Sequence, residues 1–266
     1  MQIINDLVEW QKVRNNRALS DKTIGYVPTM GNLHAGHESL LRRSKNENTI
    51  NVLSIFVNPK QFDDLNDYLT YPKTLIEDCK IAKNCGVDYL LAPTAEALFM
   101  DDFTYKIEET HLSAIMEGHW RPNHFSGMLT IVLKLLNLVM PTHLYLGEKD
   151  YQQLLLIKNM IFSFYLPIKV VACPTVREEN GLAMSSRNNR LTEQERNKGS
   201  LLSQLLLTEL STDKIQEKLT ELGFEVEYIT EYNGRRFGAV KLGNVRLIDN
   251  IALERIMKTN VLQEQT

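Results

Sequence analysis

The chain has 266 residues, of which 43% are hydrophobic and 24% charged, the balance of a folded globular protein rather than a disordered one. Its formal net charge is only −3, with Lys and Arg spread along the chain, which argues against a general nucleic-acid binder. Three widely spaced cysteines without a C-x-x-C pair argue against a disulfide framework or a thiolate zinc site.

Neither the first residues nor the most apolar stretch gives a membrane signal. The opening sequence MQIINDLVEWQKVR contains acidic residues early and lacks the apolar segment of a signal peptide. The most apolar stretch, residues 128–140, is interrupted by polar side chains and is shorter than the ~20 residues that span a bilayer. We therefore expect a cytoplasmic protein that does not bind membranes.

Short apolar runs alternate with helical patterns over the first two thirds of the chain. Five runs read as the near-continuous apolar strands of a parallel sheet covered on both faces: residues 23–28, 50–57, 87–92, 142–146 and 168–172. Four helical patterns lie between or after them: residues 36–46, 72–85, 125–139 and 150–164. This alternation predicts an α/β fold with a Rossmann-type, doubly wound parallel sheet.

The character of the chain changes after residue 177. Residues 178–190 are polar and contain an Asn-Gly pair, which is typical of a loop. Thr192 and Glu195 have the spacing of a capping box, which opens a helix. A second helix is expected over residues 213–222, and strands near 224–230 and 239–247. The sequence therefore predicts two domains, residues 1–176 and residues 177–266, of which the second is a smaller α+β domain.

The segment VPTMGNLHAGHESLL, residues 27–41, is the first with chemical information. It runs from a strand through a glycine turn into a helix, and His34 and His37 lie three residues apart at the start of that helix. A helix N-terminus favours phosphate, and two imidazoles there can donate to phosphoryl oxygens. Metal ligation and an ordinary pair of surface histidines remain open. A P-loop is excluded because His37 and Glu38 stand where that motif needs Lys and Ser or Thr.

Two further segments place polar residues beside predicted strands and helices. SIFVNPKQF, residues 54–62, ends a buried strand and places Gln61 where parallel strands release the chain into a binding crevice. Gln61 fits a hydroxy-acid ligand or a solvated turn equally well. Arg121 and His124 lie on a loop before a buried helix, where they either contribute positive charge to a site or cap the helix.

Two more segments contain a positively charged side chain beside or within a predicted loop. In LYLGEKDYQQL, Lys149 and Asp150 follow a strand end, where they fit a phosphate and ribose hydroxyls, and Gln153 lies one turn beyond. In PTVREENGLAMSSRNNRL, Ser185 and Arg187 have the composition of a loop that closes over a triphosphate. Taken singly, both segments also fit solvated surface.

These five segments, in this order and at these separations, resemble the pantothenate synthetase family of the H-x-G-H nucleotidyltransferase superfamily. The resemblance covers nearly the whole chain, through PTMGNLHAGH, FVNPKQF, YPKT, RPNHFSGM, LGEKDYQQ, REENGLAMSSRN and RLIDNI. It implies a Rossmann-type domain that binds nucleotide and pantoate, a C-terminal lid domain, and a homodimer. It also implies ATP-dependent condensation of pantoate with β-alanine to pantothenate through a pantoyl adenylate, which releases AMP and pyrophosphate, with Mg²⁺ bridging the triphosphate.

The resemblance also assigns roles to individual positions. It implies that ATP is bound by Thr29, Met30, His34, His37, Gly147, Lys149, Asp150, Val176, Met184, Ser185 and Arg187. The catalytic residues among these are His34, His37, Lys149, Ser185 and Arg187. Pantoate is bound by Met30, Gln61 and Gln153. Further family positions, without a firm role, are matched by Asn58, Tyr71, Arg121 and His124. No protein side chain is expected to hold the metal. Family members commonly carry Gly at the position of Asn123, and Asn would tolerate a backbone with positive φ there.

Two other functions use part of the same set of residues. Another H-x-G-H nucleotidyltransferase would leave a nucleotide on its product and would not need the paired Gln61 and Gln153. A non-catalytic nucleotide-binding protein would need fewer charges at the α-phosphate and would release no pyrophosphate.

Overall fold

The computed structural model describes residues 1–16 and 21–256. The chain divides into two units. The first unit comprises Met1–Glu148 and Gln152–Pro174. The second unit comprises Lys149–Tyr151 and the chain from Thr175 onward.

The first unit is built on a six-stranded sheet in the order β1-β4-β3-β2-β5-β6, and its described strand pairs are all parallel. The strands are β1 (Gln2–Ile4), β2 (Ile24–Thr29), β3 (Ile50–Ile55), β4 (Tyr89–Leu91), β5 (His143–Gly147) and β6 (Lys169–Cys173). This sheet confirms the predicted Rossmann-type class. The edge strand β1 was not expected, because three residues are too few to show a periodic pattern.

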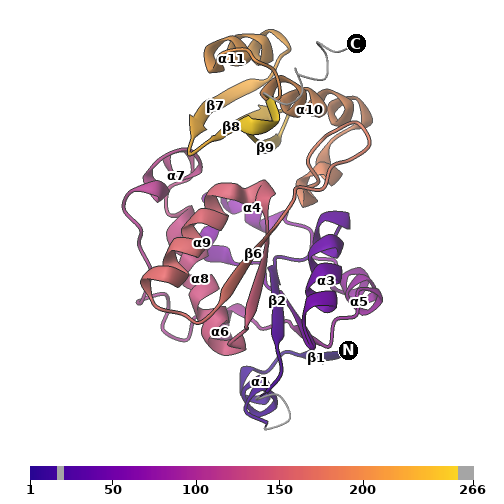
Figure 1. The fold of residues 1–266 in the computed structure, drawn as a ribbon, viewed down its shortest axis with the longest axis vertical. Helices are drawn as coiled ribbons and strands as arrows, with labels where there is room; N and C mark the ends of the chain where they lie inside the picture. Colours follow the sequence, from indigo (N-terminus) through magenta and orange to yellow (C-terminus); the bar gives the residue numbers. More distant parts are fainter. Residues whose placement is uncertain (17–20, 257–266) are drawn as a thin grey trace. The chain divides into compact units, whose positions relative to one another are not determined.

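Helices cover both faces of this sheet. The helices of the first unit are α1 (Leu7–Arg14), α3 (Ala35–Glu47), α4 (Leu65–Leu69), α5 (Leu75–Asn84), α6 (Ala95–Leu98), α7 (Glu117–Trp120), α8 (His124–Val139) and α9, which starts at Tyr151 of the second unit (Tyr151–Ser163). Figure 1 shows α3 and α5 on one side of the sheet and α8 and α9 on the other, as a doubly wound fold requires. The short helix α1 packs against α8, where Trp10 Nε1 donates to the Leu138 carbonyl at 2.7 Å.

The core between the sheet and helix α3 explains why the predicted strands form. Val27 of β2, Leu53 of β3 and Leu90 of β4 are fully buried and pack in one cluster with Leu41 of α3. Burying one such side chain stabilises the fold by roughly 1.5–3 kcal/mol. The apolar runs of the sequence are continuous because helices cover both faces of these strands.

The strand order places a switch point between β2 and β5. From β2 the chain continues to β3 and β4 on one side, and β5 and β6 lie on the other side. Ligands of doubly wound sheets bind beyond the carboxyl ends of the strands at such a point. The segment that follows β2 contains His34, and Gly147 ends β5. His34 and Gly147, both predicted to bind ATP, therefore lie at the edge of the sheet where a ligand is expected.

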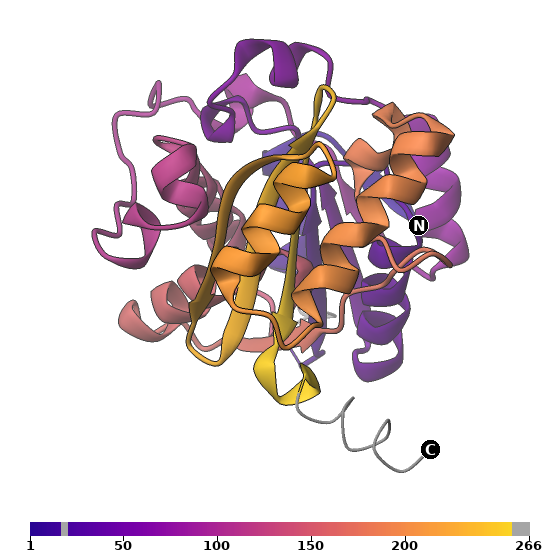
Figure 2. The same ribbon diagram turned by 90° about the horizontal axis from the view of Figure 1, so that it is seen from above.

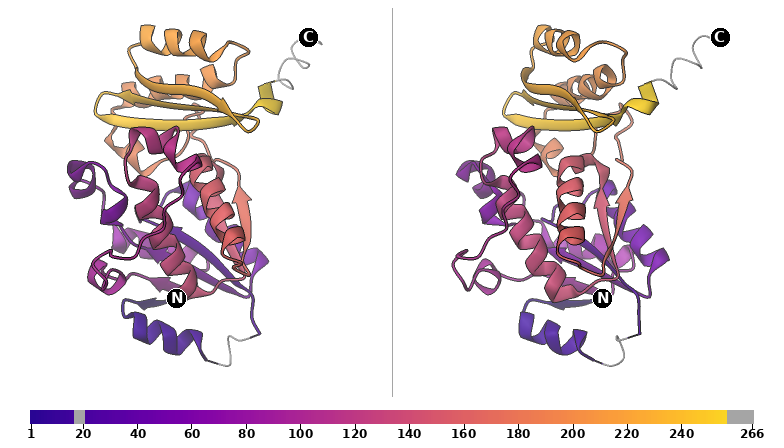
Figure 3. Two further views of the ribbon diagram at one scale, coloured as in Figure 1. Left: turned by 90° about the vertical axis from the view of Figure 1, so that its left-hand side faces the viewer. Right: turned by 60° about the vertical axis from the view of Figure 1, so that its left-hand side comes forward.

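The second unit has an antiparallel sheet in the order β7-β8-β9, with two helices on one face. Its elements are α10 (Glu193–Leu206), α11 (Thr212–Glu221), β7 (Glu225–Tyr232), β8 (Arg235–Leu242) and β9 (Val245–Ala252). Figure 2 shows α10 and α11 side by side over the strands, and Figure 3 shows the layer of helices above the layer of strands. The predicted capping box at Thr192 and Glu195 is present at the start of α10. Leu202, Leu206 and Ile215 form the buried interface with the sheet.

One predicted element of the second unit is wrong. Residues 239–247 were expected to form a single strand, but β8 ends at Leu242 and β9 begins at Val245. Gly243, with φ +55°, turns the chain between them. The apolar residues on both sides of the turn conceal it in the sequence. The predicted second domain also includes residues 257–266, which lie outside the described residues.

Within residues 1–16 and 21–256, helices that combine the length and the apolar character needed to cross a bilayer are absent.

Candidate active site

His34 and His37 mark the start of helix α3 at the carboxyl end of β2. His34 is the N-cap residue, and its Nδ1 accepts a hydrogen bond from the Gly36 amide at 3.1 Å. His37 Nδ1 accepts from the His34 amide at 3.3 Å, and the two ring centroids are 4.1 Å apart. Because both Nδ1 atoms are acceptors, the proton of each neutral ring lies on Nε2. The pair therefore carries two Nε2–H donors at a helix N-terminus, where phosphate binding is favoured.

A buried carboxylate holds the loop that leads to these histidines. Asp78 of α5 is 1% exposed, and it accepts hydrogen bonds from the amides of Asn32 at 3.0 Å and Leu33 at 2.7 Å. The Thr74 hydroxyl donates to the same carboxylate at 3.2 Å. Asn32 has a positive φ of 50°, so the loop is held in a conformation that few side chains adopt. Sequence analysis did not identify Asp78 as part of the site.

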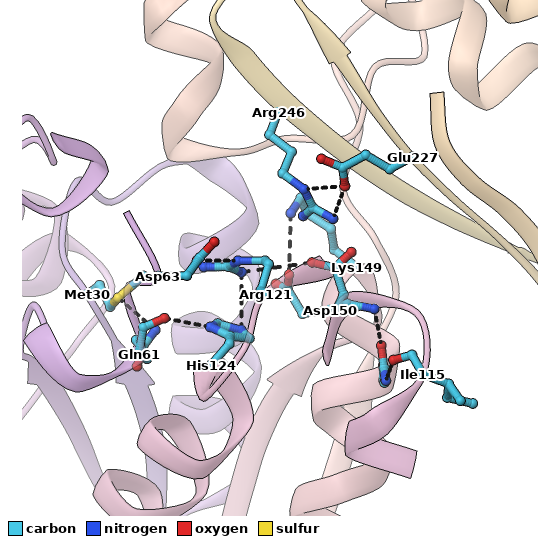
Figure 4. A network of polar contacts seen from close by, with 12 residues as sticks. Met30, Gln61, Asp63, Ile115, Arg121, His124, Lys149, Asp150, Glu227 and Arg246 are labelled. Carbon is cyan, nitrogen blue, oxygen red and sulfur yellow. Dashed lines mark hydrogen bonds and ion pairs between the residues drawn. The ribbon is translucent and has the colours of Figure 1, made fainter. Parts of the chain in front are cut away.

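Gln61, Asn58 and Met30 are brought together beyond the ends of β2 and β3 (Figure 4 draws Gln61 and Met30). Gln61 is the last residue of the 3-10 turn η1 (Pro59–Gln61) and is 9% exposed. Its Oε1 accepts from Asn58 Nδ2 at 3.0 Å, and its Nε2 lies 3.1 Å from Met30 Sδ. Asn58 is 1% exposed and also donates to the Gly127 carbonyl at 3.1 Å. A buried amide beside a thioether and a second amide suits a ligand with both apolar and hydroxyl groups.

Arg121 and His124 lie next to this cluster, but His124 does not supply positive charge. Burial, together with the charge of Arg121, lowers the pKa of His124 to about 4. Arg121 is itself paired with Asp63, at 2.9 Å, and with Glu117, at 3.8 Å. Of the two alternatives that the sequence left open for this residue, a positive charge on His124 is therefore disfavoured, because the ring is neutral at physiological pH.

The backbone before His124 adopts the left-handed conformation. Asn123, the N-cap of α8, has φ 65° and ψ −6°, in the left-handed region. Asn tolerates this region better than most side chains. The replacement of Gly by Asn at this position therefore preserves the local conformation.

Thr29 and Tyr71 both have partners within the first unit. Thr29 Oγ1 donates to the Ser54 carbonyl at 2.9 Å and accepts from the Gly31 amide at 3.3 Å, which closes the turn after β2. Tyr71 is buried, and its ring contacts that of Phe62 edge-on with centroids 5.7 Å apart. These contacts assign both side chains a part in holding the local structure.

Gly147 and Gln153 lie on either side of the junction between β5 and α9. A Cβ atom added to Gly147 would meet no protein atom within 4 Å, so packing within the chain does not require glycine there. Gln153 is half-buried, whereas the adjacent Gln152 is buried and bonds to backbone groups near residue 115. Gln152 therefore has a structural role, whereas the half-buried Gln153 is the glutamine assigned to pantoate by the resemblance.

Lys149 and Asp150 belong to the second unit. Lys149 Nζ lies 3.5 Å from Asp150 Oδ1, and the Lys149 carbonyl accepts from Asn250 Nδ2 of β9 at 2.9 Å. Asn250 is held in turn by Arg235, whose guanidinium also lies 4.0 Å from the centroid of the Tyr151 ring. These contacts from β8 and β9 fix the backbone that carries Lys149. Sequence analysis did not identify Asn250 or Arg235.

The segment from Val176 to Arg187 folds back on itself. Arg177 pairs with Ala183 in an antiparallel bridge, and the Met184 amide donates to the Val176 carbonyl at 3.0 Å. The structure thus brings the backbones of Val176 and Met184 together. Ser185 is the N-cap of the 3-10 turn η4 (Ser186–Arg190), and its Oγ accepts from the Arg187 amide at 3.2 Å.

A salt bridge anchors this segment to β9. Arg177 forms two hydrogen bonds with Asp249, at 2.6 and 2.9 Å, and Asp249 is 4% exposed. Bidentate pairs of this kind are among the stronger ion pairs of proteins.

As for metal sites, the described residues contain no group of three or more His, Cys, Asp or Glu side chains that could hold an ion.

Comparisons with known proteins give one consistent result. The family model described as Pantoate-beta-alanine ligase matches residues 2–252. A pantothenate synthetase of Coxiella burnetii is 49% identical over 257 residues, which cover 97% of this chain and 99% of the relative. A pantothenate synthetase of Legionella pneumophila is 48% identical over 253 residues, which cover 95% of this chain and all of the relative.

Solved structures agree with the sequence relatives. The pantoate-beta-alanine ligase of Francisella tularensis, in complex with beta-gamma ATP and beta-alanine, superimposes with a TM-score of 0.90 at 41% identity. That superposition covers 96% of this chain and 98% of the Francisella chain. The pantothenate synthetase of Thermus thermophilus gives a TM-score of 0.87 at 36% identity, with 95% and 99% covered.

Proposed function

Because the chain belongs to the pantoate–β-alanine ligase family, whose members condense pantoate with β-alanine at the expense of ATP, we propose that it makes pantothenate through a pantoyl adenylate. The observation that carries the proposal is the pair of histidines at the start of α3. Both Nδ1 atoms accept backbone hydrogen bonds, so Nε2–H is the donor that each neutral ring can turn toward phosphoryl oxygens.

The chemistry requires activation of a carboxylate. A pantoate carboxylate oxygen attacks the α-phosphorus of ATP, the bond from that phosphorus to the β-phosphate oxygen breaks, and pyrophosphate leaves. The amine of β-alanine then attacks the acyl carbon, AMP leaves with the former carboxylate oxygen, and the amine nitrogen loses a proton. Neither step needs a protein nucleophile, so positioning and charge stabilisation supply the catalysis.

We assign the ATP-binding roles as follows. His34 and His37 donate to the phosphates, and Lys149, Ser185 and Arg187 supply further charge and donors to the same triphosphate. Thr29 and the backbone of Met30 lie beside it. Support comes from the helix N-terminus at His34 and from the backbone contacts that fix the Lys149 and Ser185 segments. The nucleoside is bound by Gly147, Asp150, Val176 and Met184.

Pantoate is assigned to Met30, Gln61 and Gln153. The contact between Gln61 and Met30 and the burial of Gln61 support this assignment, because a held amide offers a hydroxy acid both an acceptor and donors. Asn58 holds the Gln61 side chain in place, because its Nδ2 donates a hydrogen bond to Gln61 Oε1. In this proposal residues 1–176 bind nucleotide and pantoate, and residues 177–266 act as a lid.

Three further properties are proposed on the resemblance to the family. Mg²⁺ enters with ATP and is held mainly by phosphate oxygens and water, as Mg²⁺ usually is at nucleotide sites. The chain acts as a homodimer, and it acts in the cytoplasm.

An oxygen-transfer experiment tests the proposed function. The protein is incubated with ATP, β-alanine and pantoate labelled with ¹⁸O in its carboxylate, and AMP and pantothenate are analysed by mass spectrometry. We expect equal amounts of AMP and pantothenate, and one ¹⁸O atom in each AMP. A nucleotidyltransferase that leaves the nucleotide on its product would release no free AMP, and a binding protein would release neither product.

A further inference from the structure

The turn that carries Gln61 rests directly on the first turns of helix α8. A Cβ atom at Gly127 would lie 2.1 Å from the Lys60 carbonyl oxygen and 2.8 Å from the Gln61 amide nitrogen. This approach is closer than any side chain permits, so the turn and the helix meet backbone to backbone. The position of Gln61 is therefore set by α8.

His124, the first residue of α8, makes the shortest hydrogen bond between the two elements. Its Nδ1 lies 2.7 Å from the Gln61 carbonyl oxygen, and its Nε2 lies 3.2 Å from Arg121 Nη1 (Figure 4). A carbonyl oxygen only accepts, so Nδ1 must carry the proton. A guanidinium only donates, so Nε2 must be bare. The two neighbours together fix one neutral tautomer of the ring.

Arg121 is placed to select this tautomer rather than to bind an anion. Its Nε donates to Asp63 Oδ1 at 2.9 Å, and Glu117 Oε2 lies 3.8 Å from its Nη1. The Arg121 side chain is only 12% exposed, and two carboxylates already balance its charge. A substrate carboxylate would have to compete with both of them.

We propose that His124 is a positioning residue for pantoate: its Nδ1–H holds the Gln61 backbone, and Arg121 maintains the tautomer that provides this proton. The inference rests on the proposed role of Gln61 in pantoate binding. With its carbonyl held by His124 and its side-chain oxygen held by Asn58, Gln61 keeps one orientation before pantoate arrives. Such preorganisation removes an ordering cost from substrate binding. His124 itself need not touch pantoate.

Two substitutions at His124 separate the hydrogen bond from the packing. His124→Leu keeps most of the volume and removes the donor, whereas His124→Asn retains an amide nitrogen near the place of Nδ1. We expect His124→Leu to raise the KM for pantoate on the order of 10- to 100-fold while the KM for ATP stays within about twofold. His124→Asn should restore most of the loss.

A matched control lies two turns further along the same helix. Thr130 is 3% exposed, and its hydroxyl accepts from the Ile107 amide and donates to the Ser126 carbonyl. Thr130→Val should lower the melting temperature without changing the KM for pantoate. If His124→Leu does not fold, Arg121→Gln at the partly exposed neighbour is measured instead, and we expect a selective rise in the same KM.

The outcomes divide clearly. A rise in pantoate KM with His124→Leu that His124→Asn reverses supports the proposal. Equal changes in the KM for both substrates, or a loss of stability alone as in Thr130→Val, would overturn it. Gln61→Ala tests the premise separately: an unchanged pantoate KM in that variant rejects the role of Gln61, whatever His124 does.

Discussion

The carboxylate of Asp78 accepts a hydrogen bond of 2.7 Å from the backbone amide of Leu33, the residue immediately before His34. Asp78 lies on α5, some 45 residues further along the chain, and it is almost fully buried. A second bond, from the Asn32 amide, fixes the preceding residue in its left-handed conformation. The position of the proposed phosphate-binding histidines thus depends on a side chain from another helix, which holds the backbone of the two residues before them.

Replacing Asp78 by Asn should therefore impair catalysis as well as stability. The new amide group faces a backbone N–H, so one buried donor is left without an acceptor, at a cost of about 1–3 kcal/mol. Displacement of the loop should lower kcat on the order of 10- to 100-fold. Urea unfolding and steady-state rates measure the two effects.

Asp88→Asn serves as the control for this prediction. Asp88 also accepts from a backbone amide, that of Asn51 at 2.8 Å, and from Lys45, but it lies at the opposite edge of the sheet, where the strands begin. We expect Asp88→Asn to lower stability and to leave kcat close to that of the wild type. An equal loss of kcat in both variants would show that Asp78 acts through stability alone.

Gly147→Ala tests whether a ligand occupies the space beside Gly147. No protein atom lies within 4 Å of the added Cβ, so the melting temperature should not change. The KM for ATP should rise about tenfold, because the nucleoside is proposed to lie against this backbone. Gly238→Ala is the control: it should lower the melting temperature and leave the KM for ATP unchanged. Its Cβ would lie 2.9 Å from Ile229 Cδ1 in the core of the second unit. An unchanged ATP KM in Gly147→Ala would contradict the assignment.

The neutral state of His124 predicts a pH dependence of stability. Its pKa is about 4 in the folded protein, against 6.5 for an ordinary histidine, so the unfolded chain binds the extra proton first. Stability from the neutral ring is complete above about pH 6.5 and is lost as the pH falls through about 4, by about 3 kcal/mol in all.

Chemical unfolding of the wild type and of His124→Asn between pH 7 and pH 5 measures this dependence. We expect the free energy of unfolding of the wild type to fall over this range and that of the variant to stay nearly flat. The hydrogen bond from Arg43 lowers the pKa of Glu47, so this carboxylate stays ionised over the measured range. Parallel curves for the two proteins would assign the dependence to other groups.

Asn250→Asp tests the support of Lys149. The substitution keeps the oxygen that accepts from Arg235 but replaces the amide that donates to the Lys149 carbonyl. We expect kcat to fall on the order of tenfold. In a Lys149→Ala background the same change should cost little, because the two residues then act as a unit. Additive losses in the double variant would contradict this coupling.

Most of the fold was predictable because its signals are local. Val27, Leu53 and Leu90 lie in continuous apolar runs, and such runs are diagnostic of strands covered on both faces. The pair β8 and β9 was read as one strand because Gly243 interrupts residues that are apolar on both sides. Strand β1 pairs with β4, more than 80 residues further along the chain, and only tertiary contacts stabilise so short a strand.

The residues assigned to the proposed site were named from the sequence, whereas the residues that support them were not. His34, Gln61 and Met30 stand in recognisable segments, whereas Asp78 and Asn250 reach those segments from other elements. One signal did exist for Asp78. It shares a buried helix face with Ala82, and an acidic residue on such a face requires partners. Its partners are backbone amides, which a sequence does not display.

The neutrality of His124 was also hidden from the sequence. A histidine next to an arginine in RPNHF reads as a cluster of positive charge. Burial and the fixed donor Arg121 remove that charge, and both depend on the packing of η1 against α8.

The most direct test of the proposed function is isotope exchange between pyrophosphate and ATP with pantoate present and β-alanine omitted. A two-step enzyme should exchange label at a rate that depends on pantoate, and His34→Ala should lower that rate on the order of 10²–10³-fold. Folded protein that binds ATP but exchanges no label, with or without pantoate, would contradict the formation of a pantoyl adenylate.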